Sequence, residues 1–116
     1  MEVITTEIPG VLIFKPKVFG DERGFFMESF NQRSWLSATG LDCEFVQDNH
    51  SKSGAIYTLR GMHYQAPPFA QTKLVRVVRG RVLDVVVDMR PSSPTYRAVV
   101  AVELTADAGE QILAPR

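Results

Sequence analysis

Hydrophobic positions along the chain fall into short stretches rich in Val, Ile, Leu and Phe, which Gly, Pro, Asp and Ser interrupt at close intervals. Short apolar runs separated by turn residues are typical of all-β sandwiches and barrels. We predict nine strands, over residues 3–8, 11–14, 24–29, 44–49, 55–65, 74–79, 81–87, 98–104 and 111–113. The pattern therefore predicts an all-β fold.

One short helix interrupts this pattern, and we predict it over residues 32–38. Asn31 can cap its first turn, and Gly40 can take the left-handed conformation that ends a helix. Residues 79–81 (Arg-Gly-Arg) predict a tight reversal between two strands, and residues 90–94, which include two prolines, predict a rigid turn. No internal repeat or interdomain linker is evident, so the chain is expected to form one domain over residues 1–116.

The composition adds no structural element to this picture but excludes several kinds of partner and location. Thirteen basic and thirteen acidic residues give a net charge of zero, which disfavours nucleic-acid binding because that binding needs a basic excess. The single cysteine, Cys43, excludes an internal disulfide and fits a reducing compartment. The N-terminus lacks the features of a signal peptide, and no apolar run approaches the roughly 20 residues of a membrane span. These observations predict a cytoplasmic protein without a membrane or nucleic-acid partner.

The last residues of the sequence break the pattern, because residues 114–116 follow directly after the start of a predicted strand. A barrel that ends in this way leaves unpaired strand edges, which natural proteins usually avoid. We expect either that another chain covers those edges or that the domain is truncated at its C-terminal side.

His63 is the side chain most suited to catalysis. A histidine side chain can serve as a base near neutral pH, and Lys73 follows ten residues later at the start of an apolar strand. A base and a cation held on a rigid strand are two of the groups needed to remove a proton from a carbon next to a carbonyl. Nothing around them suggests a cofactor site, so the pair indicates cofactor-free proton transfer.

Alternation along the predicted strands groups the other polar candidates. Gln47 and Asn49 share one face of their strand, and His63 lies on one face of its own with Gly61 and Gln65. Asp84 lies within a very apolar strand, on the face opposite Leu83, Val85 and Val87, and Lys73 is a plausible partner for its carboxylate. From the residues alone, each of these side chains has an equally simple structural interpretation.

A metal site is not expected. Small β-barrels that bind a metal usually present two histidines two residues apart together with a carboxylate. Here Gln65 stands two residues after His63, and the second histidine, His50, lies on another segment. The set of ligands is therefore too small.

Five motifs occur in order and are specific when taken together. They are residues 19–30 (FGDERGFFMESF), 47–51 (QDNHS), 59–65 (LRGMHYQ), 73–88 (KLVRVVRGRVLDVVVD) and 93–96 (SPTY). This set closely resembles the dTDP-4-dehydrorhamnose 3,5-epimerases, and the resemblance spans nearly the whole chain.

The resemblance implies a cupin-type jelly roll that acts as a homodimer on a dTDP-4-keto-6-deoxy sugar, without a cofactor. It implies that His63 is the general base for C3 and C5 and that Lys73 stabilises the enolate oxygen. Glu28 matches a contact that the family supplies from the neighbouring subunit. Contacts to the nucleotide sugar are implied for a further group of residues, namely Arg23, Gln47, Asn49 and Arg60, with Asp48 in the same binding run and Lys73 also touching the sugar.

The chain also departs from the family, whose members continue beyond residue 116 to the tyrosine that reprotonates the sugar. Tyr57, Tyr64 and Tyr96 do not match that tyrosine. We therefore expect residues 1–116 alone to be inactive or severely impaired, because loss of general-acid help typically costs about 10²–10⁴-fold in rate.

Two alternatives stay open at this point. Related cupins epimerise only one carbon of a dTDP-sugar or move its ketone between C3 and C4, and this part of the sequence separates them poorly. A cupin that binds a sugar nucleotide without catalysis is the alternative from a different class.

Overall fold

A four-stranded antiparallel sheet forms the centre of the structure. In the computed structural model, which describes residues 1–42 and 44–116, the sheet has the order β1-β2-β8-β5. Its strands are β1 (Glu2–Thr5), β2 (Leu12–Lys15), β8 (Gln111–Ala114) and β5 (Lys73–Arg76). The two central strands, β2 and β8, thus lie about as far apart in sequence as the chain allows. Cys43, the subject of the disulfide argument, lies outside the described residues.

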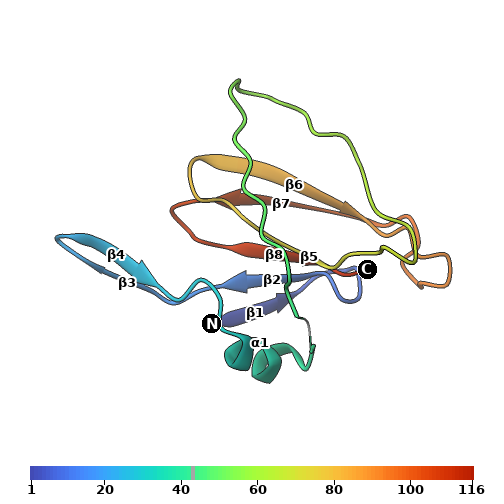
Figure 1. Ribbon diagram of the computed structural model, residues 1–116, viewed down its shortest axis with the longest axis horizontal. Helices are drawn as coiled ribbons and strands as arrows, with labels where there is room; N and C mark the ends of the chain where they lie inside the picture. The colour runs from blue at the N-terminus through green and yellow to red at the C-terminus, as the bar shows by residue number, and fades with distance from the viewer. Residues whose placement is uncertain (43) are drawn as a thin grey trace.

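Two hairpins accompany this sheet. One consists of β6 (Arg81–Val87) and β7 (Val99–Thr105), which pair over seven residues each, and it lies across one face of the sheet (Figure 1). The other consists of β3 (Val18–Asp21) and β4 (Gly24–Met27). This second hairpin projects from one end of the molecule, away from both sheet layers (Figure 1).

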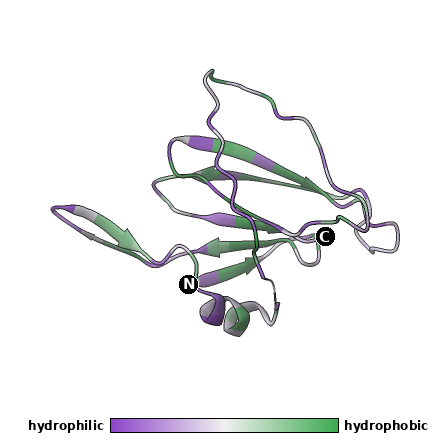
Figure 2. Cartoon of the chain, viewed as in Figure 1, coloured by the Kyte–Doolittle hydropathy of each residue, from purple (hydrophilic) through white to green (hydrophobic). Residues whose placement is uncertain are grey.

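The sheet has a hydrophobic core on each face, because successive residues of a strand point to opposite sides. Ile112 and Val75 face the β6–β7 hairpin and pack with Leu104 of β7. Leu113 faces the other way and packs with Phe14 and Trp35. Figure 2 shows that hydrophobic residues predominate in the strands that provide these side chains.

The helix α1 (Gln32–Thr39) covers the second face and confirms the predicted position within one residue. The Asn31 side chain accepts hydrogen bonds from the backbone N–H groups of Arg33 and Ser34, a cap worth about 1 kcal/mol. Gly40 ends the helix at φ 68°, as predicted. Trp35 is the helix residue that enters the core, where its ring stacks on Phe14 with centroids 4.2 Å apart.

The prediction of strands over residues 44–49 and 55–65 is wrong for this structure. Both segments belong to a long, extended stretch between α1 and β5 that carries no strand among the described residues and arches away from the sheets (Figure 1). A strand needs a hydrogen-bonded neighbour, and no such neighbour lies beside this stretch. Leu59 is consequently 90% exposed and Val46 86% exposed. Strand parity, on which we grouped Gly61, His63 and Gln65, does not apply there.

The remaining strands agree with the prediction in position, with ends that shift by up to three residues, and β6 agrees at both ends. One strand was missed, because residues 18–21, which form β3, were not predicted as a strand. The two predicted turns are present: Gly80 adopts φ 79° between β5 and β6, and residues 90–97 form consecutive turns. The mostly-β architecture with one short helix is therefore confirmed.

Candidate active site

Lys73 and Asp84 are the two predicted site residues that the sheets bring into electrostatic contact. Lys73 opens β5 on the face that carries Val75, and Asp84 lies on β6 with Val86, so both side chains face the core between the two layers. Burial raises the pKa of the Asp84 carboxyl, and the nearby Lys73 ammonium partly offsets that rise. The expected partnership is therefore present as a charge interaction, without a direct ion pair among the described residues.

Asp84 and Val86 of β6 are partly buried on the side of the core, whereas Leu83 on the opposite face is exposed. Leu83 is 68% exposed, while Val86 packs against the core cluster. An apolar strand usually buries its most hydrophobic face. Placing Asp84 inward instead costs solvation energy, and such a cost is typical of a functional carboxylate.

Asp88 follows four residues later and shows the opposite behaviour. It is 3% exposed and accepts hydrogen bonds from Arg90, Ser93 and Thr95. These donors, led by the Arg90 guanidinium, hold the pKa of the Asp88 carboxyl far below its usual range. The two carboxylates thus differ in environment. Asp88 accepts several hydrogen bonds, whereas Asp84 is partly desolvated and its charge is only partly offset by Lys73.

His63 is exposed on the long stretch between α1 and β5, and its ring orientation is set locally. Its Nδ1 lies 2.9 Å from the carbonyl oxygen of Gly61. A carbonyl oxygen can only accept a hydrogen bond, so Nδ1 carries the hydrogen and Nε2 of the neutral ring carries the free lone pair. Nε2 is therefore the nitrogen available as a base. No hydrogen bond or ion pair in the described part of the chain joins His63 to Lys73.

The other candidates on this stretch make short-range contacts. The Gln47 amide donates to the side-chain oxygen of Asn49 at 3.0 Å, so these two residues do share a side. Arg60 donates to the Ser53 hydroxyl at 3.3 Å. Asp48 is exposed. The structure therefore assembles pairs of candidates rather than one closed site.

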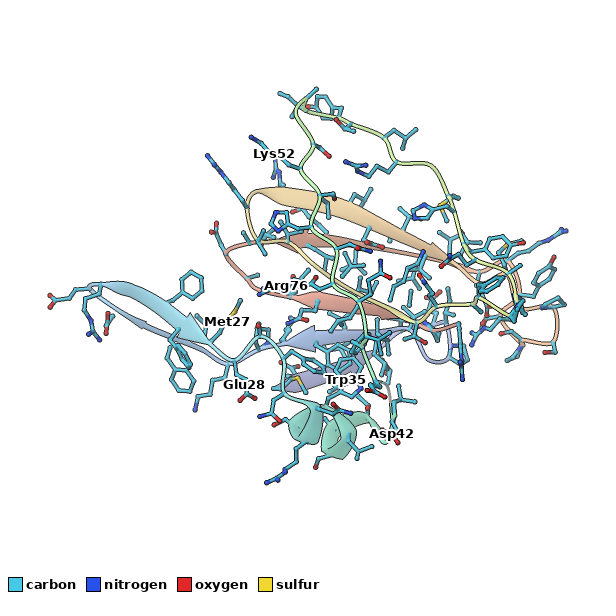
Figure 3. The ribbon with its side chains drawn as sticks, in the orientation of Figure 1. Met27, Glu28, Trp35, Asp42, Lys52 and Arg76 are labelled. Carbon is cyan, nitrogen blue, oxygen red and sulfur yellow. The ribbon has the colours of Figure 1, made fainter. Side chains whose placement is uncertain are left out.

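Arg23 and Glu28 lie away from the others, on and beside the projecting β3–β4 hairpin. Arg23 forms an exposed ion pair with Asp21 in the hairpin turn, and its guanidinium lowers the pKa of that carboxyl. Glu28 accepts a hydrogen bond from the Asn31 side chain at 3.1 Å. Figure 3 shows Glu28 where the hairpin meets the rest of the molecule, beside Met27.

Aromatic side chains gather at the base of this hairpin, a feature that we did not predict. A cavity of about 300 Å³ opens there between the hairpin, α1 and β2. Its lining includes the predicted site residue Glu28 and five aromatic residues, namely Phe14, Phe19, Phe26, Phe30 and Trp35. The signal available in the sequence was the Phe-rich run around residues 19–30.

Metal ligands do not gather anywhere in residues 1–42 and 44–116, where no three His, Cys, Asp or Glu side chains lie close enough to hold an ion. No helix in the same residues is long and apolar enough to cross a membrane.

Comparison with known proteins gives a consistent result. The profile of the family described as dTDP-4-dehydrorhamnose 3,5-epimerase matches residues 5–116. The dTDP-4-dehydrorhamnose 3,5-epimerase of Shigella flexneri is 62% identical over 115 residues, which are 99% of this chain and 63% of that protein. The chain thus spans somewhat less than two thirds of the length of this relative.

Solved structures agree with the sequence match. The dTDP-4-dehydrorhamnose 3,5-epimerase of Bacillus anthracis, with TDP and PPi bound, superposes with a TM-score of 0.94 at 43% identity, covering 99% of this chain and 65% of that one. A Legionella pneumophila epimerase in complex with dTDP-4-keto-L-rhamnose gives 0.89 at 43%, covering 99% and 60%. ChmJ, a 3'-monoepimerase from Streptomyces bikiniensis in complex with dTDP-quinovose, gives 0.82 at 36%, covering 95% and 55%.

The fold is therefore that of the cupin-type sugar-nucleotide epimerases, a class of isomerases. Within that class, the chain belongs to the dTDP-4-dehydrorhamnose 3,5-epimerase family. The family match includes every residue that we predicted for the site, from Arg23 to Asp84. The individual roles of these residues stay predictions.

Proposed function

We propose that the protein containing this chain is a dTDP-4-dehydrorhamnose 3,5-epimerase. It converts dTDP-4-dehydro-6-deoxy-D-glucose to dTDP-4-dehydro-L-rhamnose and supplies dTDP-L-rhamnose synthesis. The observation that carries the proposal is the family match over residues 5–116, which includes His63 and Lys73 in their expected motifs. The cytoplasmic location predicted from the sequence is part of this proposal.

His63 acts as the base in the proposed mechanism. The C4 ketone acidifies the hydrogens on C3 and C5, so Nε2 of His63 can remove each proton in turn without a cofactor. The electron pair of the broken C–H bond moves to the C4 oxygen and forms an enolate. A proton then returns to the opposite face of the same carbon and inverts it. We assign that proton donor to no residue among 1–116.

Lys73 is proposed to stabilise the enolate, because its ammonium offers a positive charge to the oxygen on which negative charge develops. Asp84 supports Lys73. Its desolvated carboxylate can hold the ammonium in position from the next sheet layer, and the charge interaction between them supports this role.

The nucleotide part of the substrate is assigned to the remaining polar residues. Arginine binds a diphosphate through paired hydrogen bonds, and amides orient neutral sugars and bases. Arg23 and Arg60 are proposed for the diphosphate. Gln47 and Asn49 are proposed for the neutral groups, with Asp48 beside them.

We propose further that the protein is a homodimer in which Glu28 reaches the neighbouring subunit's site. The β3–β4 hairpin supports this arrangement, because it projects from the molecule with Phe26 71% exposed and Phe25 63% exposed (Figure 1). An exposed pair of phenylalanines on a two-stranded arm is costly in water and favours burial against a partner. Glu28 lies at the base of that arm, directly after β4.

A single-carbon epimerase is the second candidate function, and the likeness to the monoepimerase ChmJ favours it specifically. A ketoisomerase or a non-catalytic sugar-nucleotide-binding cupin are the further alternatives. Product analysis of the full-length protein with dTDP-4-dehydro-6-deoxy-D-glucose in D₂O separates all four. Deuterium at both C3 and C5 supports the 3,5-epimerase, deuterium at one carbon supports the monoepimerase, a 3-keto product supports the isomerase, and dTDP binding without exchange supports the binding protein.

His63→Asn tests the role of the base in the same assay. We expect exchange at both carbons to fall about 10²–10⁴-fold, because loss of a general base typically costs that much. His50→Asn is the matched control, since His50 is the only other histidine and is also exposed. Equal activity of the two variants would contradict the assignment of His63.

A further inference from the structure

Charge is distributed very unevenly along this neutral chain. Residues 49–83, which we call the acid-free segment, contain no Asp or Glu and six basic residues. These are Lys52, Arg60, Lys73, Arg76, Arg79 and Arg81. All thirteen carboxylates of the chain lie outside the segment, so its positive charge is a local property that the net charge of zero conceals.

None of the six cations of the acid-free segment forms an ion pair among the described residues. The ion pairs in the described part of the chain use Lys15, Arg23 and Arg90, all of which lie outside the segment. Five of the six cations are exposed, and only Lys73 is partly buried. The five exposed charges therefore project into solvent without a direct ion pair, whereas Lys73 shares a charge interaction with Asp84.

The segment includes two parts of the structure, the long stretch after α1 and the β5–β6 connection. Arg60 reaches back seven residues and donates to the hydroxyl of Ser53, the residue after Lys52. Arg79 and Arg81 flank Gly80 in the exposed turn, and Arg81 opens β6. In Figure 3, Lys52 and Arg76 both lie toward the end of the molecule at which β6 begins. Arg76 and Arg81 thus lie on β5 and β6, the strands that carry Lys73 and Asp84.

We infer that the acid-free segment steers the substrate electrostatically to the site, with Arg76, Arg79 and Arg81 accelerating its arrival without binding it. This inference rests on the proposed function, because it needs an anionic ligand. A nucleoside diphosphate sugar carries two negative charges on its diphosphate. Clefts lined by charge of one sign raise the association rates of oppositely charged ligands by 10–10³-fold.

Steering has a physical signature that direct contact lacks. Exposed charges act over about 30 Å at 10 mM salt but over only about 4 Å at 0.5 M, so a steering charge loses its effect as salt rises. Charges at the rim of a binding site change the association rate constant rather than the dissociation rate constant. We therefore expect Arg79 and Arg81 to affect association alone, and to do so at low salt.

Stopped-flow binding of dTDP labelled on its 3′-hydroxyl to the full-length protein tests the inference. Arg79→Gln/Arg81→Gln should slow association about three- to tenfold at 10 mM salt and should match the parent protein at 0.5 M salt. Its dissociation rate constant and kcat should not change. Arg79→Lys/Arg81→Lys keeps the charge and removes the guanidinium, so it should retain the parental rate.

Two controls separate local charge from other causes. Arg33→Gln/Arg97→Gln makes the same change in net charge outside the acid-free segment and should leave association unchanged. Binding of uncharged thymidine should not respond to the 79/81 variants. Equal association of the Gln pair and the parent at 10 mM salt, or an equal loss in the Arg33/Arg97 control, would overturn the inference. Failure of the parent protein to bind dTDP would instead overturn the proposed function, and the inference with it.

Discussion

Asp88 provides the sharpest test of how the β6–β7 layer is held in place. Its oxygen Oδ1 accepts hydrogen bonds from the backbone N–H and the Nε of Arg90 at 3.1 and 2.9 Å. Its oxygen Oδ2 accepts from Arg90 Nη2, from the Ser93 hydroxyl and from the Thr95 hydroxyl. Arg90 also donates to the carbonyl oxygen of Pro9, 81 residues away, so the network ties the β6–β7 connection to the turn between β1 and β2.

Asp88→Asn keeps the size of the side chain and replaces Oδ2 with an amide N–H₂ group. Three donors would then face a donor, and the Arg90 guanidinium would lose its counter-charge. Hydrogen bonds to a charged group are worth about 1.5–3 kcal/mol, and removing one partner of a buried pair costs about 3–5 kcal/mol. The Arg90 side chain is 38% exposed, so solvent screens part of this loss. We expect the free energy of unfolding to fall by about 2–3 kcal/mol.

Urea denaturation of the two proteins measures this difference, and the m-value should stay constant if only stability changes. The pH dependence provides a second readout. Because the pKa of Asp88 is lowered in the folded state, the carboxylate stabilises fully above the unfolded-state pKa of about 4, and this stabilisation is lost as pH falls below that value. The difference between parent and Asp88→Asn should therefore shrink on acidification.

Asp21→Asn is the matched control, because Asp21 also pairs with an arginine two residues away but is exposed. Its substitution should change stability little. An Asp88→Asn protein that unfolds within about 0.5 kcal/mol of the parent, or a difference that is the same at pH 3 and pH 7, would refute the reasoning.

Three further predictions follow from other parts of the structure. Gly109→Ala should destabilise the protein by about 1–3 kcal/mol in urea denaturation, because the residue adopts φ 67° and a Cβ would lie 2.8 Å from Sδ of Met27; an unchanged midpoint would contradict this. Asp84→Asn should raise stability near neutral pH, because the raised pKa of Asp84 makes its charged form unfavourable in the folded state, and it should lower epimerase activity. A loss of both stability and activity would contradict the idea that Asp84 is kept for function at a cost in stability. Brief trypsin treatment of residues 1–116 should cleave at Lys52 and Arg60 before any site in a strand, and mass spectrometry of the first fragments would show whether cleavage begins elsewhere.

Local signals explain the elements that the sequence predicted well. The Asn31 cap and the Gly40 terminus act within a few residues, so the position of α1 is specified by its own sequence. In the same way, β6 combines a glycine turn at its start with seven residues of high strand propensity. The helix α1 would be expected at this position whatever the rest of the fold, whereas β6 also needs its partner β7.

The strands that were wrongly predicted or missed depend on contacts with other parts of the chain. Residues 55–65 have the composition of a strand, but composition cannot provide the neighbour that a strand must pair with. In contrast, β3 is short and exposed along its whole length, and it forms because β4 folds back on it. The candidate site was predictable as a set of residues through the motifs, whereas the inward direction of Asp84 and the separate position of Arg23 depend on the packing of layers.

The arrangement of the central sheet also constrains how the protein is made. Its two middle strands, β2 and β8, come from opposite parts of the chain, so the N-terminal hairpin cannot find its neighbour until residues 111–114 have left the ribosome. Until then Phe14 has no Leu113 to pack against and remains open to solvent or to chaperones. Such long-range pairing slows folding in general. The order of strands in this sheet therefore predicts that its core forms only once β8 has emerged, rather than stepwise from the N-terminus.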